Sequence, residues 1–375
     1  MIELIGKYSK DCKIFADKVE DEVISQVMGV LNHPAFENVP VRIMPDCHAG
    51  SGCVIGFTAK VSDKIIPNLI GVDIGCGMLS YNFKSDLTHK ALFDLLDEII
   101  KADIPNGCNV HQKEQKVNDE LLGKLTEICK RTNQDLSYVL KSLGTLGGGN
   151  HFIECGSDGN NSKWLTVHSG SRNFGLKIAN YHQKIAHEKN PSFGKDLSWL
   201  EGDDAKNYLS DMRVAQEFAS LNRRMIIDTI ITKSKHSKND FIESIHNYIS
   251  DDDMIRKGAI SAKKDELVII PWNMRDGLII GKGKSNNDWN NSAPHGAGRV
   301  LSRSKAKELI NIEDYKKSME GIFTSCVNED TIDESPMAYK PHTEVEQYLS
   351  ESVEIIHRVK PFYNFKASEK QKKRK

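Results

Sequence analysis

Three glycine-rich segments of the sequence carry residues that could bind a metal ion: GVDIGCGM, GGGNHFIE and VHSGSRNFG. The candidate ligands in them are Asp73, Cys76, His151 and His168. Glycine weakens helices and strands, so its concentration beside carboxylate, thiol and imidazole groups indicates backbone bent closely around something that is not protein. Neighbouring residues that could donate to phosphate are Asn150, Ser169, Ser171 and Arg172. We therefore predict a metal site that also takes a phosphorylated ligand.

Each of these residues also has a plain structural explanation. Asp73 could form a turn, Cys76 could be a buried apolar residue, and the two histidines could be hydrogen-bonded core residues. The metal interpretation is favoured because the ligand types recur together in glycine-rich surroundings. His246, in the segment IHNYI on an expected helix, says little by itself.

Other histidines differ in what they indicate. His295 follows a proline and begins the segment HGAGR. Small residues there leave room for a bulky group and Arg299 could bind phosphate, so this imidazole could be a nucleophile on phosphorus. The alternative is a histidine without function at a capped helix start.

His182 and His187 are five residues apart, about 140° around a helix, and are expected at the surface. Asp46 and His48 could orient metal ligands from behind or pack at a strand end.

The elements that must position these residues can be read from the apolar pattern. Residues 40–85 read as short strands, VRIMP, CVIGFTA, LIGVDI and MLSYNF, and the region from 88 to 141 changes to helical spacing. Residues 144–175 return to strands and turns, and two long helices follow as an insertion at about 176–235. A strand-rich block, LVIIPWNMRDGLIIGKG, and the segment SVEIIHRVKPFYNF come later. The prediction is a mixed α/β fold with a helical insertion.

Composition limits the classes of function. The chain has 375 residues, 39% of them hydrophobic and 27% charged, which is typical of a globular enzyme. No linker divides it, so we expect one domain over 1–365 and a basic tail over 366–375, either solvated or in contact with RNA. A net charge of -1 argues against a uniformly basic nucleic-acid surface. Without a leader pattern or an apolar run of membrane length, a soluble cytoplasmic protein with no membrane partner is expected.

The eight cysteines include no CxxC pair, so neither a zinc ribbon nor a thioredoxin-type motif is expected. They are spread along the chain without the dense spacing of a small secreted scaffold. Most should be reduced, and several should simply be buried.

Taken together, the motifs resemble those of the RtcB RNA ligases. The similarity runs in order through MPDCHAG, GVDIGCGM, LGGGNHFIE, VHSGSRNFG, HNY, PWNMRDG, HGAGRVLSR and YNFK, and so spans nearly the whole chain. The resemblance implies an RtcB-like fold, with mixed sheets around a deep metal cleft. It also implies a GTP-dependent ligase that joins RNA 2′,3′-cyclic phosphate or 3′-phosphate ends to 5′-hydroxyl ends, in RNA repair or tRNA splicing.

The resemblance assigns roles to individual residues. Cys76 would bridge two manganese ions, with Asp73 and His151 completing one site and His168 and His246 the other. His295 would be guanylylated, and the GMP would pass to the RNA end as an RNA-(3′)pp(5′)G intermediate. The implied GTP-binding residues are Asn150, His151, Phe152, Ile153, Glu154, His246, Asn247, Pro271, Trp272, Asn273, Met274, His295, Gly296, Ala297, Gly298 and Lys366. Arg172 and Arg299 are predicted to bind RNA phosphate.

Some features depart from this pattern or leave alternatives. Leu278 stands where the resemblance predicts a serine that touches the nucleotide, so one GTP contact is expected to be missing or to come from another group. A cysteine with three histidines would bind zinc more tightly than manganese on intrinsic affinity, so manganese follows from the resemblance alone. A dinuclear metallohydrolase acting on phosphate esters would need the five ligands but not His295. A catalytically silent RNA-binding factor is the other alternative, and a monomer is expected.

Overall fold

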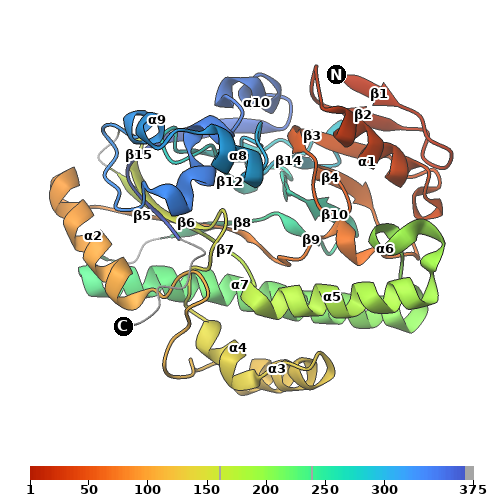
Figure 1. Cartoon of the computed structure of the whole chain (residues 1–375), viewed down its shortest axis with the longest axis horizontal. Coiled ribbons are helices and arrows are strands. Elements are labelled where there is room, and N and C mark those ends of the chain that lie inside the picture. Colours follow the sequence, from red (N-terminus) through yellow and green to blue (C-terminus); the bar gives the residue numbers. More distant parts are fainter. Residues whose placement is uncertain (160–161, 238–239, 368–375) are drawn as a thin grey trace.

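The computed structural model describes residues 1–159, 162–237 and 240–367. Over those residues the strands form sheets of seven, six and two strands, and α-helices cover them (Figure 1). The mixed α/β class predicted from the sequence is confirmed. Of the predicted tail 366–375, residues 368–375 lie outside the described residues.

The seven-stranded sheet carries most of the chemistry-bearing segments. Its neighbouring strands are all antiparallel. In order across the sheet they are β12 (Leu267–Pro271), β13 (Leu278–Gly283), β15 (Val353–Lys366), β6 (Phe152–Ser157), β7 (Lys163–Ser169), β5 (Gly77–Phe83) and β8 (Phe241–Ile245). The Ile269 N–H in β12 donates to Ser244 Oγ in β8 at 3.0 Å, so the two edge strands meet and the sheet nearly closes on itself.

The six-stranded sheet brings strands from the first 60 residues of the chain beside residues 247–257. In order, its strands are β1 (Ile2–Leu4), β2 (Cys12–Ile14), β3 (Val41–His48), β4 (Ile55–Lys60), β10 (Met254–Lys257) and β9 (Asn247–Ile249). Only β2 and β3 pair in parallel. The two-stranded sheet joins β11 (Ala259–Ser261) to β14 (Ser292–Pro294). The ends of β3 and β14 bring the MPDCHAG and HGAGR motifs together.

Helices fill the intervals between the strands. They are α1 (Asp21–Leu31), α2 (His89–Asp103), α3 (Asp119–Arg131), α4 (Leu136–Ser142), α5 (Arg172–Lys189), α6 (Gly194–Leu197), α7 (Gly202–Ser234), α8 (Arg303–Leu309), α9 (Ile312–Ser318) and α10 (His342–Leu349). Polar side chains fix where they begin: Thr88 accepts from the N–H of Ala91 in α2, and Asn118 does the same at α3. The long helices α5 and α7 run side by side under the sheets (Figure 1). The predicted long helices are therefore present.

One predicted strand is absent. The segment LIGVDI, read as a strand, instead forms the end of a 3₁₀ turn at Pro67–Leu69 and a loop leading to β5. The loop has positive φ at Gly71 (90°) and Gly75 (72°), a backbone conformation that interrupts a strand and that glycine adopts at little cost. Leu69, Ile70 and Ile74 of this segment are buried, although not on a sheet, whereas Val72 is exposed.

The expectation that His182 lies at the surface is wrong. Its side chain is buried, its Nε2 lies 2.8 Å from Asp211 Oδ2, and Arg131 forms an ion pair with the same carboxylate. His187 is half-buried, with Nδ1 3.3 Å from Ser198 Oγ. The two rings do point to different sides of α5, but both sides are covered by other elements. Among the described residues, no helix is both long and apolar enough to cross a bilayer.

Candidate metal centre and nucleotide pocket

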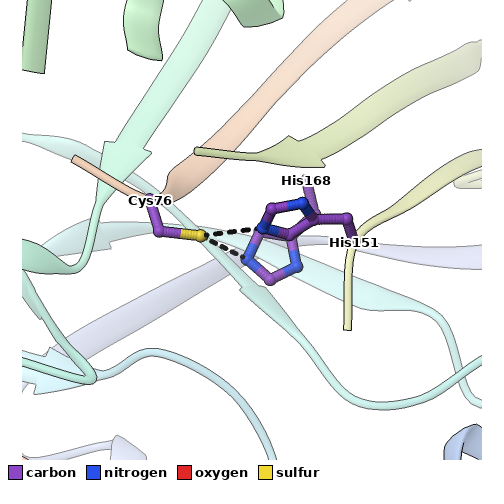
Figure 2. Close-up of side chains that lie close together, drawn as sticks. All are labelled: Cys76, His151 and His168. Atoms are coloured by element: carbon purple, nitrogen blue, oxygen red, sulfur yellow. Dashed lines mark hydrogen bonds between the residues drawn. The ribbon is translucent and has the colours of Figure 1, made fainter. Parts of the chain in front are cut away.

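All five predicted metal ligands meet at one place, where four are buried and Asp73 is half-buried. Cys76 Sγ lies 3.3 Å from His168 Nε2 and 3.5 Å from His151 Nε2 (Figure 2). Asp73 Oδ2 is 3.0 Å from His151 Nε2, and His246 Nε2 is 3.4 Å from His168 Nε2. Cys76, His151 and His168 are buried, and their ligand atoms lie within 4.8 Å of one another. Carboxylate, thiol and imidazole atoms are thus gathered at one point.

Hydrogen bonds behind the rings orient two of the histidines. His151 Nδ1 is 2.9 Å from the carbonyl of Leu146, and His168 Nδ1 is 3.2 Å from that of Asn150. A carbonyl only accepts, so each Nδ1 carries the proton and each Nε2 turns a lone pair towards the cluster. Converging lone pairs repel one another unless a cation lies between them. The donor set therefore fits a divalent transition-metal ion.

The acidic ligands support the same interpretation. Burial opposes ionisation of Asp73, but a cation at His151 Nε2 outweighs it. When no metal is bound this cation is a second proton on the ring, whose hydrogen bond and charge hold the pKa of Asp73 at about 2. Burial, and then the negative charge of Asp73, raise the pKa of Cys76 well above its ordinary value. A thiolate at this position therefore requires a cation to stabilise it.

Glycine and a main-chain donor set the position of Asp73. The N–H of Ser171 donates to Asp73 Oδ1 at 3.1 Å. A Cβ atom on Gly170 would lie 2.2 Å from the same oxygen, so any side chain there would displace the carboxylate. This close approach explains why the VHSGSR segment needs glycine at that point.

Helix α7 braces the loops that carry the ligands. The fully buried Arg223 donates to the carbonyls of Gly75 and Ser169 at 2.8 and 2.7 Å and pairs with Glu243 at 2.8 Å. The preceding Asn222 donates to the Thr145 carbonyl at 3.1 Å. These bonds tie the residues beside Cys76 and His168 to one rigid helix.

His246 does not lie on a helix, so that expectation is wrong. It lies between β8 and β9, where its N–H donates to the carbonyl of Cys76 at 3.0 Å and its own carbonyl accepts from Gly258 N–H at 2.7 Å. The apolar spacing of IHNYI arises because both flanking strands are partly buried. Burial, and then the charges of His295 and His168, lower the pKa of His246 well below its ordinary value, so the ring is neutral and able to bind metal.

His295 lies next to the metal cluster and is held by Asp46. Its ring centroid is 4.9 Å from that of His246. Its Nδ1–H donates to Asp46 Oδ2 at 2.7 Å, and the same oxygen accepts from the N–H groups of His295 and Gly296 at 3.1 and 3.2 Å. This leaves His295 Nε2 with its lone pair. Asp46 is fully buried, so the imidazole is fixed in one tautomer.

A cavity of about 220 Å³ opens beside His295. The predicted nucleotide residues that line it are Asn150, Phe152, Glu154, His246, Pro271, Trp272, Asn273, Met274, His295, Gly296, Ala297, Gly298 and Lys366. Three others do not line it. His151 belongs to the metal cluster, Ile153 lies in the apolar core on the other face of β6, and Asn247 donates to the Asp73 carbonyl at 3.2 Å.

Two buried carboxyl groups, Glu154 and Glu334, lie near the cavity, and their surroundings shift their pKa values in opposite directions. Glu154 accepts from Asn364 Nδ2 at 2.9 Å, and burial raises its pKa to about 8. Glu334 pairs with Lys366 Nζ at 2.7 Å. Burial opposes its ionisation, but the charges of Lys366 and two nearby arginines hold its pKa at about 2. The second carboxylate is ionised and anchors Lys366 at the wall of the cavity.

The two predicted phosphate-binding arginines lie in different places. Arg299 lines the cavity, with its guanidinium bonded to Glu334 and to the carbonyl of Asp333 at 3.2 and 2.6 Å. Arg172 is not among the lining residues. It donates to Thr145 Oγ1 and to the Gly107 carbonyl, at 3.2 and 2.8 Å.

Sequence reasoning did not assign several lining residues to the nucleotide site: His48, Gly277, Arg303, Tyr339 and Asn364. Arg303 and Asn364 lie inside the motifs HGAGRVLSR and YNFK, so the motifs marked the segments but not the residues. Tyr339 lies in none of the motifs, so nothing in the local sequence indicated a role for it. His48 was given two alternative roles from the sequence, as was Asp46.

Comparison with known proteins identifies the family. A family model described as tRNA-splicing ligase RtcB matches residues 26–138 and 125–367. The chain belongs to the RtcB family. It is similar to the RNA-splicing ligase RtcB of Escherichia coli K12, with 33% identity covering 90% of this chain and 92% of that protein. It is also similar to the tRNA-splicing ligases RtcB of Nanoarchaeum equitans, at 27% identity, and Methanococcus maripaludis, at 26%. These cover 91% and 88% of this chain and 91% and 87% of the archaeal proteins.

The RtcB resemblance inferred from the motifs is thus confirmed, and the RtcB-like fold class with it. Leu278, where the motif differs, does not line the cavity. It is buried in an apolar cluster with Phe152 and Val359. Leu278 therefore packs behind Phe152 and does not face the cavity.

Proposed function

We propose that this RtcB-family chain is a GTP- and Mn²⁺-dependent RNA ligase. It would join RNA 3′-phosphate ends, or 2′,3′-cyclic phosphate ends after hydrolytic opening, to 5′-hydroxyl ends in RNA repair or tRNA splicing. The observation that carries the proposal is the position of His295. It lies between the five-ligand cluster and the cavity, with a carboxylate behind Nδ1 that leaves Nε2 free to act as a nucleophile.

Asp73, Cys76, His151, His168 and His246 would hold two manganese ions, and when bound these supply Lewis-acid stabilisation of charge on the reacting phosphates. Lys366, Arg299 and Arg303 at the cavity wall would face the phosphates of GTP. Glu334, which pairs with all three, keeps these cations in place. Arg172 also remains a proposed RNA phosphate contact, on the sequence pattern around His168 alone.

The reaction would run through His295. Its Nε2 attacks the α-phosphorus of GTP, a P–N bond forms, and the bond to the departing pyrophosphate oxygen breaks. Asp46 keeps the proton on Nδ1 and stabilises the positive charge that develops on the ring. An oxygen of the RNA 3′-phosphate then displaces the imidazole, giving the RNA-(3′)pp(5′)G end. Finally the 5′-hydroxyl attacks the 3′-phosphorus, loses its proton, and GMP departs.

The test is labelling of the full chain with [α-³²P]GTP and Mn²⁺ without RNA, followed by a denaturing gel. We expect a protein-bound label that is lost in acid and survives alkali, as a phosphoramidate does. His295→Ala should abolish it, whereas His187→Ala, a half-buried histidine on α5, should label like the wild type. Absence of label from the wild type, with phosphodiester hydrolysis present in His295→Ala, would overturn the proposal in favour of a metallohydrolase. Absence of both activities would favour a catalytically silent RNA-binding protein.

A further inference from the structure

Two buried acceptor atoms at the cavity wall have no hydrogen-bond partner within the described protein: Glu154 Oε1 and Asn364 Oδ1. Glu154 is 2% exposed and Asn364 1%, and both line the cavity. A buried acceptor left unpaired costs roughly 1–3 kcal/mol. Two of them side by side indicate that a ligand, and not the protein, completes these bonds.

The two residues are fixed relative to each other by the sheet. Glu154 in β6 and Asn364 in β15 are direct partners in the antiparallel register. Asn364 Nδ2 donates to Glu154 Oε2 at 2.9 Å, so Asn364 Oδ1 and Glu154 Oε1 are the two oxygens of the pair that this bond does not use. The pair therefore presents one carboxylate oxygen and one amide oxygen next to each other.

Two adjacent hydrogen-bond acceptors in the protein favour a ligand that carries two adjacent hydrogen-bond donors. Guanine has two such donors, because its N1–H and its 2-amino group lie side by side on one edge of the base. Adenine offers one donor and one acceptor on its corresponding edge, so its N1 lone pair would face an oxygen. Hypoxanthine keeps N1–H but lacks the 2-amino group. Phe152 and Trp272 line the same cavity and provide apolar surface for a planar base.

We propose that Asn364 is a specificity-determining residue, whose Oδ1 accepts a hydrogen bond from the guanine 2-amino group while Glu154 Oε1 accepts from N1–H. This rests on the proposed use of GTP. The motif YNFK does not by itself distinguish Asn364, because the role of this residue depends on its cross-strand partner. ITP, which has no 2-amino group, should bind about tenfold more weakly than GTP, the loss expected for one buried hydrogen bond.

The experiment measures how well unlabelled GTP and ITP compete with [α-³²P]GTP for adduct formation on the full chain with Mn²⁺. In Asn364→Leu, of similar volume but without polar atoms, GTP should weaken about tenfold and ITP little, so that their ratio approaches one. Asn364→Asp places a second carboxyl group beside Glu154. If the two carboxyl groups share one proton, the aspartate still offers an acceptor oxygen to the 2-amino group, so the preference for GTP should remain. Thermal melting without nucleotide checks that each variant folds.

The outcomes separate this inference from the proposed function. If no nucleotide labels the wild type, the ligase proposal itself fails. If GTP labels it but ITP competes equally well, no 2-amino contact exists and the inference is overturned, even if Asn364→Leu does not fold. An unchanged GTP/ITP ratio in a folded Asn364→Leu variant would overturn it as well.

Discussion

At the residue scale, two glutamates in one cavity show how surroundings decide ionisation. Burial acts on both. It dominates at Glu154, where Asn364 and Lys366 offset it only in part, and the pKa rises to about 8. At Glu334 the charges of Lys366, Arg303 and Arg299 outweigh burial, and the pKa falls to about 2. At neutral pH the first is therefore mostly protonated and the second ionised.

This difference predicts that GTP binding releases a proton from Glu154. Its carboxyl carries a proton below about pH 8 in the free protein, and the N–H donors of guanine would favour the carboxylate. Affinity for GTP should therefore rise with pH up to about 8 and then level off. Calorimetry at pH 7, in two buffers of different ionisation enthalpy, measures the proton released.

Glu154→Gln is the control, because glutamine at this position cannot release a proton. Any protons that the phosphates of GTP release are the same in the variant and the wild type. The difference between the two measured proton releases is therefore the contribution of Glu154. Equal release by Glu154→Gln and the wild type would contradict the prediction.

At the element scale, the loops that carry the ligands are held by close packing as well as by hydrogen bonds. Arg223 and Asn222 on α7 bind the carbonyls of several ligand loops. Glycine lets two of these loops approach each other, and at Gly170 no space remains for a side chain.

Gly170→Ala should therefore impair metal binding. Its Cβ would lie 2.2 Å from Asp73 Oδ1 and push the carboxylate out of the cluster. We expect the variant to hold less manganese than the wild type after equilibrium dialysis, measured by atomic emission, and to form little adduct.

Gly123→Ala is the matched control. Gly123 lies inside α3, and nothing lies within 4 Å of a Cβ built there. This change should leave metal content unchanged and raise the free energy of unfolding by about 0.5–1 kcal/mol, because alanine favours the helix. Full manganese content in Gly170→Ala would show that Asp73 is not a ligand or that the loop adapts.

At the scale of the whole molecule, the cluster joins distant parts of the chain. Asp73 and Cys76 precede β5, and His151 precedes β6. His168 is the penultimate residue of β7, and His246 follows β8. Ions bound by these residues would stabilise the native arrangement over the unfolded chain, by about 2.7 kcal/mol for each site at a hundred times its dissociation constant.

Manganese should accordingly raise the melting temperature of the full chain by a few degrees in thermal denaturation, and chelation should reverse the effect. Cys76→Ser should lose most of the shift. Cys108→Ser changes an exposed cysteine and should keep it. A shift of the same size in Cys76→Ser would mean that manganese stabilises the protein from another site.

The sequence by itself determined the ligand types, the glycine-rich turns that hold them, most of the strands and helices, and the family. These depend on local pattern, since periodicity and backbone freedom are properties of short segments. Only the tertiary structure decided what stands behind and beside the reactive groups. Asp46 reaches His295 across 249 positions, Asn364 meets Glu154 through strand register, and α5 is covered on both sides where His182 was expected in solvent. Such contacts arise from packing between elements, which no short segment encodes.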